Sequence, residues 1–140
     1  MSRKDIIKNK IKTSKFYVNK VTAEKINKGH SDEPLSINQE AVCTILENSN
    51  DYLSIKVNNK ISFKPEALFS VEIEHIMEFK LKDKMTDKEI KDNINEIVIP
   101  LGGVSSYIVS SITKEMIGSH LILPPTIEIR KVEKNNKQAK

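Results

Sequence analysis

The side chains that could carry chemistry in this sequence are few and lie far apart. Cys43 is the one cysteine in 140 residues, and His30, His75 and His120 are the three histidines. A single cysteine excludes an internal disulfide and a multi-cysteine zinc site. Histidines at such wide spacing provide no metal-binding motif, so we expect neither a metal nor another cofactor. Cys43 lies in an apolar segment, which favours a small buried hydrophobe over a nucleophile.

Enzyme motifs are also missing. The sequence contains no glycine-rich phosphate loop, no His-Glu-x-x-His and no Gly-x-Ser-x-Gly. The Gly102–Ser106 segment could begin an anion-binding helix, but it lacks a preceding strand and a lysine partner. His75 lies within an apolar alternation, which indicates a hydrogen-bonded core residue and not a base or a metal ligand. We therefore predict that the protein is not an enzyme.

The composition suits one domain spanning residues 1–140. Hydrophobic residues make up 38% of the chain and charged residues 30%, enough for a single core. No apolar run approaches the roughly 20 residues that a membrane span needs. The N-terminus is polar and lacks the apolar stretch of a secretory signal. We expect a protein of the reducing cytoplasm with no membrane partner.

The positive charge lies at the two ends of the chain. Residues 1–30 carry nine basic and two acidic side chains, residues 31–127 nine and fifteen, and residues 128–140 five and two. A nucleic-acid-binding protein usually carries its basic patch on the folded body, so we do not expect nucleic acid as the main partner. We predict a flexible basic arm over residues 1–15 and a basic tail over residues 133–140.

Four strands are predicted before the first helix. Their expected bounds are Phe16–Ile26, Glu40–Glu47, Tyr52–Phe63 and Phe69–Leu81. The fourth carries the clearest signal, because apolar residues recur at every second position over 13 residues. On its polar side only Ile76 breaks the alternation. Long strands joined by short turns predict an antiparallel meander.

Helix follows the strands. Thr86–Glu89 has the pattern of a capping box, and apolar residues then recur at helical spacing. We expect Pro100 to break or kink this helix and the glycine pair that follows to loosen it. Gly118 marks the end of the second segment, and the prolines of Leu121–Pro125 favour an extended backbone. Alternation over Ile127–Val132 favours a last strand. The predicted fold class is α+β, with a four-stranded antiparallel sheet and a long broken helix packed on one face.

In its order of elements the chain resembles the export chaperone SecB and its relatives. The resemblance runs from Ala67 to Pro125, and its most specific parts are Asn95–Pro100, Tyr107–Thr113 and Leu121–Pro125. It implies dimers that pair into a tetramer, with unfolded preproteins held in long apolar grooves. It also implies that an export motor ATPase docks on acidic side chains at the outer face of the sheet.

Two sets of candidate site residues follow from this resemblance. Aromatic or flexible side chains suit promiscuous contacts, with ordinary core packing as the alternative. The acidic set would meet the motor, with a solvated sheet face as the alternative. The groove candidates are Phe63, Phe69, Met77, Phe79, Tyr107 and Met116, and the docking candidates are Glu24, Glu72 and Glu74.

The resemblance has departures. The family's Gly-Gly in the fourth strand is replaced here by Ile76 and its neighbours. SecB proteins usually end in a further helix, where Thr126–Val132 here alternates like a strand. Three functions stay open. The chain could be a holdase for unfolded or export-bound polypeptides, or a SecB-fold interaction protein of a toxin–antitoxin, phage or uncharacterised system. The third alternative is a nucleic-acid-binding accessory protein that uses its basic ends.

Overall fold

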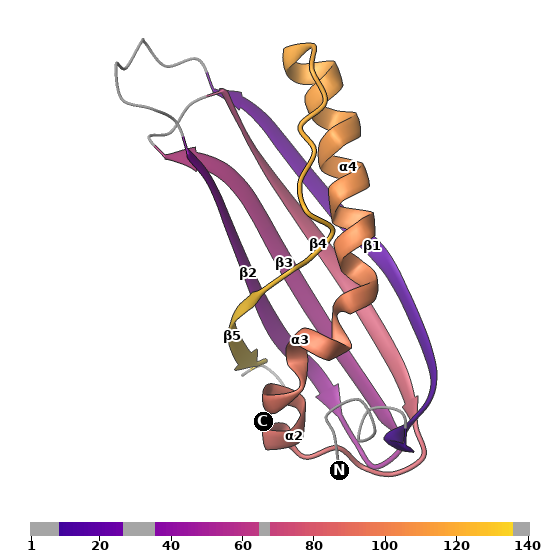
Figure 1. The fold of residues 1–140 in the computed structure, drawn as a ribbon. Helices are drawn as coiled ribbons and strands as arrows, with labels where there is room; N and C mark the ends of the chain where they lie inside the picture. Colours follow the sequence, from indigo (N-terminus) through magenta and orange to yellow (C-terminus); the bar gives the residue numbers. More distant parts are fainter. Residues whose placement is uncertain (1–8, 27–35, 65–67, 136–140) are drawn as a thin grey trace.

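A sheet of long strands carries helices on one of its two faces (Figure 1). The structure, a computed structural model, describes residues 9–26, 36–64 and 68–135. Three helical segments follow β4, and the chain then returns along α4 to the sheet. The strands are β1 (Ile11–Ile26), β2 (Ser36–Asn48), β3 (Tyr52–Lys64), β4 (Leu68–Leu81) and β5 (Ile129–Lys134). The helices are α2 (Asp87–Asp92), α3 (Ile94–Ile97) and α4 (Ile99–Ile117).

The sheet has five strands and is mixed, which corrects the predicted four-stranded antiparallel meander. The strand order is β1-β4-β3-β2-β5. Strands β2, β3 and β4 form the expected meander, but β1 pairs antiparallel with β4 and not with β2. The outer edge of β2 is occupied by β5, which runs parallel to it. Because β3 already lies between β2 and β4, the edge of β4 is the place left for β1.

The first strand is longer than predicted, and the last strand lies two residues further along the chain than predicted. β1 begins at Ile11, which pairs with Leu81 of β4. Residues 11–15, which we assigned to a flexible arm, therefore belong to the sheet. β5 extends to Lys134, so the predicted tail loses its first two residues to a strand. The rest of the predicted arm and tail, residues 1–8 and 136–140, lies outside the described residues. The same holds for residues 27–35, where we predicted a loop, and for residues 65–67, where we predicted the end of a strand.

The alternation of β4 is confirmed. Its apolar positions are buried toward the helices, and its acidic positions lie on the opposite face. Ile76, the exception, is 8% exposed on the outer face, where Tyr17 of β1 and Lys56 of β3 pair with it on either side. Neighbouring side chains on the outer face thus cover Ile76.

The helix begins as the sequence predicts and breaks earlier than expected. The Glu89 amide donates to Thr86 Oγ1 over 3.1 Å, and the Thr86 amide donates to Glu89 Oε1 over 3.0 Å. Breaks occur at Asn93 and Val98. Pro100 lies in the first turn of α4, where its missing N–H removes no helical bond, so it begins a helix and does not break one. No helix in the described ranges is both long and apolar enough to cross a membrane.

After α4 the chain runs back along the helix as an extended segment, residues 119–128, which we call the strap (Figure 1). Gly118 ends α4 in the left-handed conformation, with a φ of 79°. Hydroxyl groups of α4 fix the strap. Ser106 Oγ donates to the Leu123 carbonyl over 2.8 Å, and Thr113 Oγ1 accepts from the Leu121 amide over 2.8 Å. The strap therefore moves with α4 and connects it to β5.

The core between sheet and helices is divided into two apolar clusters. The first lies under α2, α3 and the start of α4, and the second lies under the rest of α4 and the strap. Members of the first cluster include Cys43, Val57, Met77, Phe79, Ile90 and Leu101. The buried members of the second cluster are Ile61, Phe69, Val71, Ile73, Val109 and Leu123.

Gly102 offers a direct test of how the strap packs. We expected the glycine pair to loosen the helix, but a Cβ on Gly102 would lie 2.1 Å from the Pro125 carbonyl oxygen. Gly102→Ala should therefore destabilise the protein by roughly 1–3 kcal/mol. A Cβ on Gly103 would meet no neighbouring atom of the described residues within 4 Å, so Gly103→Ala should stabilise the helix by about 0.5–1 kcal/mol. Urea denaturation of both variants would measure the two shifts, and equal shifts would contradict the close contact.

Candidate functional site

Of the side chains that could react, Cys43 and His75 are closed off from solvent, whereas His120 is exposed beside Ser110 of α4. Cys43 is fully buried, and burial raises the pKa of its thiol to about 12, which keeps it protonated. His75 is also fully buried, and its Nε2 lies 2.7 Å from Ser105 Oγ. Both match the predicted core roles. Across the described ranges, no group of three or more His, Cys, Asp or Glu is placed to hold a metal ion.

Three of the six groove candidates are core residues in this chain, which corrects our expectation for them. Phe69, Met77 and Phe79 are all nearly or fully buried. They lie on the parity of β4 that faces the helices, and α2, α3 and α4 with the strap cover that face. We expected Met77 and Phe79 to form the floor of a groove near the end of β4, where sheet and helix would separate. In the structure α2 and α3 cover this end of the sheet and pack in the same cluster as both residues.

The other three candidates lie at or beyond the edge of the second cluster. Phe63 is half-buried and packs edge-on against Phe69, with ring centroids 5.1 Å apart. Met116 is half-buried against the same cluster. Tyr107 is 74% exposed on the solvent side of α4. The six candidates are therefore distributed over two clusters and one open surface, and they do not line a single groove.

A different set of apolar side chains is open to solvent on the helix-bearing side of the molecule. On β1 these are Phe16 and Val21, which pair with core positions of β4 and therefore point to the helix-bearing side. On β2 it is Ile37, which pairs with Phe63. The others lie on α4 and on the strap, where Ile122 is 78% exposed. We call this set the open apolar surface, and its members are Phe16, Val21, Ile37, Ile99, Tyr107 and Ile122.

Sequence reasoning found only Tyr107 of this set. One signal was available for Ile122, because an extended segment cannot bury Leu121, Ile122 and Leu123 on the same side. No comparable signal existed for Phe16 and Val21, because their exposure depends on β1 being an edge strand. Strand order is a tertiary property that the local pattern of β1 does not contain.

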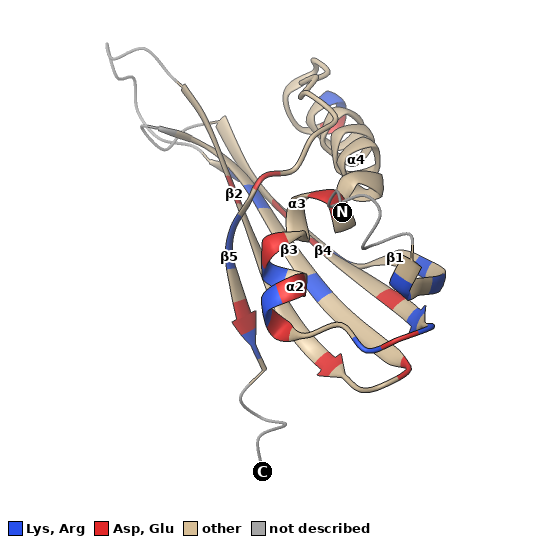
Figure 2. Cartoon of the chain, turned by 60° about the horizontal axis from the view of Figure 1, so that its bottom comes forward, with Lys and Arg blue, Asp and Glu red and all other residues tan. Residues whose placement is uncertain are grey.

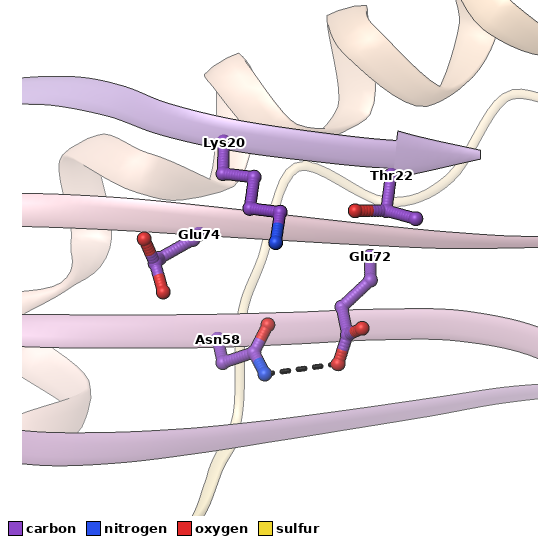
Figure 3. A pocket seen from close by; sticks show the side chains of 5 residues that line it. All are labelled: Lys20, Thr22, Asn58, Glu72 and Glu74. Carbon is purple, nitrogen blue, oxygen red and sulfur yellow. Dashed lines mark hydrogen bonds between the residues drawn. The ribbon is translucent and has the colours of Figure 1, made fainter.

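The three docking candidates lie together on the outer face of the sheet. The register pairs Glu24 with Ser70 and Glu72 with Thr22, and alternate residues share a face. Figure 3 shows Glu72 and Glu74 at a polar pocket that Lys20, Thr22 and Asn58 complete. The sequence therefore placed the acidic candidates on the correct face, and no contact with a partner tests their predicted role.

Basic and acidic residues both occur along the strands of the sheet (Figure 2), and the register brings residues of both signs together on this outer face. Asn58 Nδ2 donates to Glu72 over 3.0 Å, and Asn19 Nδ2 donates to Glu74 over 2.6 Å. Lys56 Nζ lies 3.8 Å from Glu74. The register places lysines of β1 and β3 beside both carboxylates. The outer face is thus a mixed-charge ladder and not a concentrated acidic patch.

The fold belongs to the SecB-like class. The SecB-like chaperone Rv1957 of Mycobacterium tuberculosis, solved in complex with a ChAD peptide from the Rv1956 HigA1 antitoxin, matches with a TM-score of 0.67. That match has 11% identity and covers 89% of this chain and 92% of the other. A protein of unknown function from Streptococcus agalactiae matches with a TM-score of 0.52, at 13% identity over 80% of this chain and 95% of the other.

Sequence comparison adds no closer relative. No family model matches the chain, and no curated protein matches it by sequence. At identities this low the two structural matches establish the fold and leave the function to be argued from the surface. The mycobacterial match supports the SecB-like fold that the resemblance implied, although the sheet of this chain is mixed and has five strands.

Replacing Phe79 separates a core role from a binding role. Phe79 is 3% exposed in the first cluster, so Phe79→Ala should cost about 3–5 kcal/mol of unfolding free energy. Tyr107→Ala removes an exposed ring and should change that free energy by no more than about 0.5 kcal/mol. Denaturant midpoints measure both changes. A small loss for Phe79→Ala would make Phe79 a groove candidate again.

Proposed function

We propose that this protein is a SecB-fold holdase that binds unfolded polypeptide segments on its open apolar surface without catalysis. The observation that carries the proposal is the exposure of six large apolar side chains on the helix-bearing side. Monomeric soluble proteins rarely leave extended apolar patches open unless a partner covers them. The peptide bound in the mycobacterial SecB-like complex supports a polypeptide as that partner.

The arrangement of the surface suits unfolded chains. Its members lie on the edge strand β1, on β2, on α4 and on the strap, so it offers apolar contacts without one shaped pocket. Such contacts bind by buried area and tolerate many sequences. Cys43 and His75 are both buried, and binding by apolar contacts requires no chemical step. Unfolded preproteins in the cytoplasm are the clients that we propose.

Two tyrosines on opposite faces of the molecule allow a matched test. Tyr107, which is 74% exposed, lies on the open apolar surface, whereas Tyr17, which is 42% exposed, lies on the outer face beside Ile76. We expect the wild type to delay aggregation of a slow-folding test protein. Tyr107→Ser combined with Ile122→Ser should weaken binding of that client at least about tenfold, because each buried aromatic or aliphatic group contributes 1 kcal/mol or more.

Tyr17→Ser serves as the control and should leave client binding unchanged. Both variants must keep the denaturant midpoint of the wild type, which separates lost binding from lost folding. A wild type that never delays aggregation would contradict the holdase proposal. Equal effects of the two substitutions would move the binding site away from the helix-bearing side.

A dedicated interaction partner is the second candidate function. The mycobacterial SecB-like neighbour is described with a peptide from one particular antitoxin, which favours a chaperone committed to one client. Two unrelated unfolded proteins distinguish the candidates. A general holdase binds both with similar affinity, whereas a dedicated chaperone binds neither and delays no aggregation until its own partner is supplied.

Docking of an export motor ATPase on Glu24, Glu72 and Glu74 is the weakest part of the proposal. A motor that recognises carboxylates needs a surface of one sign. Here Lys20 and Lys60 pair across the strands with Glu74 and Glu72, respectively. The mixed ladder favours a holdase that works without the motor.

Self-assembly is also part of the proposal. β1 is an edge strand of the sheet, and it carries Phe16 and Val21 exposed beside the helix. An edge with apolar side chains is covered most simply by a second copy. Such an assembly leaves Ile37, Ile99, Tyr107 and Ile122 of the open apolar surface for clients. We therefore expect a homodimer or homotetramer in light scattering at tens of micromolar protein. Phe16→Asp with Val21→Asp should shift it toward monomer, and a strictly monomeric wild type would contradict the assembly.

A further inference from the structure

A buried polar layer crosses the core between the two apolar clusters. Asn59 of β3, His75 of β4 and Ser105 of α4 are all buried. Ser105 Oγ lies 2.7 Å from His75 Nε2 and accepts from Asn59 Nδ2 over 3.1 Å. Gln39 of β2 extends the layer by donating to Asn59 Oδ1 over 3.3 Å.

This layer falls at the boundary between the clusters on three elements at once. On β3, Val57 belongs to the first cluster and Ile61 to the second, with Asn59 between them. On β4 the boundary is His75, and on α4 it is Ser105. Leu101 before Ser105 packs in the first cluster and Val109 after it packs in the second. The C-terminal half of α4 is therefore attached to the sheet by one polar layer and one separate cluster.

The surroundings of the His75 imidazole do not stabilise its protonated, charged form. Its Nδ1 is buried without a hydrogen-bond partner in the described part of the chain. The residues that face it are Val18 of β1, Val57 of β3 and Ser105 of α4, none of which titrates. On β2 the titratable group of this face is the buried Cys43 thiol, which is neutral.

The acidic side chains of β4 cannot compensate a charge on His75. Glu72, Glu74 and Glu78 have the opposite parity and lie on the outer face. A proton on the imidazole would thus be buried without a counterion, which is strongly unfavourable. Burial accordingly lowers the pKa of His75 to about 4.

We infer that His75 is an acid-sensitive latch, whose protonation releases the C-terminal half of α4 with the strap and exposes the second apolar cluster. Release lets water reach the imidazole, while the first cluster keeps α2, α3 and the start of α4 on the sheet. The inference concerns a conformational equilibrium and goes beyond the proposed function. It holds or fails independently of client binding.

The direction of the pH dependence follows from linkage. In the released form the imidazole is solvated and has its ordinary pKa of about 6.5. The released form therefore binds more protons than the closed form below this pH, and acid favours release. From the two pKa values, the equilibrium constant for release should rise about 20-fold between pH 7 and pH 5.

Hydrogen exchange on the full chain tests this latch. We would measure amide exchange by mass spectrometry from pH 7 to pH 5 and correct it for the intrinsic rate. Peptides from residues 105–117 should gain about 20-fold in exchange, while peptides from α2 should not. His75→Gln keeps an amide donor for Ser105 but cannot titrate, so it should abolish the gain. His120→Gln removes an exposed histidine near α4 and should retain it.

Imidazole NMR of the wild type gives a second readout if His75→Gln fails to fold. One histidine should then titrate together with the gain in helix exchange. Three results would overturn the inference. These are exchange that does not change with pH, a gain that persists in His75→Gln, and a gain of equal size in α2, which would mean global unfolding.

Discussion

One side of β4 presents Phe69, Val71, Ile73, Met77 and Phe79 in a row, and hiding this row from water is the constraint on which the other elements depend. The chain meets the constraint with three helical segments, which change direction at Asn93 and Val98. The strap then fills the remaining space with Leu123 and Ile127.

The close approach of strap and helix is a consequence of that covering. α4 must leave room for a second chain segment over the same face, so its side toward the strap consists of small residues. Gly102 meets the Pro125 carbonyl, and Ser106 and Thr113 bond to the strap backbone. These contacts satisfy polar groups that an irregular segment would otherwise bury unpaired. They also determine where the chain leaves α4 and where β5 meets β2.

Local features could be predicted from the sequence because their causes are local. The alternation of β4, the capping box at Thr86 and the glycine cap at Gly118 each depend on a few neighbouring residues. The position of β1 beside β4 and the parallel pairing of β5 with β2 depend on which edges are vacant after the meander forms. No residue of β1 or β5 carries that information alone. The predicted meander therefore had the wrong partner for β1 and did not include the last strand in the sheet.

The same distinction separates the candidate residues. Residue type identified Phe79 and Tyr107 equally as groove candidates, yet packing buries the first and exposes the second. The sequence placed the carboxylates of Glu72 and Glu74 on the correct face, because the alternation along a strand decides which face a residue occupies. Their lysine and asparagine neighbours come from other strands and could not be predicted in the same way. The open apolar surface consists of apolar residues that the helices and the strap leave uncovered, so it can be recognised only once the positions of those elements are known.

The polar layer and the open apolar surface are physically adjacent. Val18 of β1 pairs with His75, and Phe16 pairs with Met77 one inward-facing position away along the same edge strand. The apolar area available beside β1 is therefore set by how closely α4 sits over Val18, which packs against the second cluster. A polar layer in a core contributes less attachment than apolar contacts of the same area. The polar layer therefore makes α4 easiest to displace next to β1, where apolar side chains of that edge strand already meet solvent.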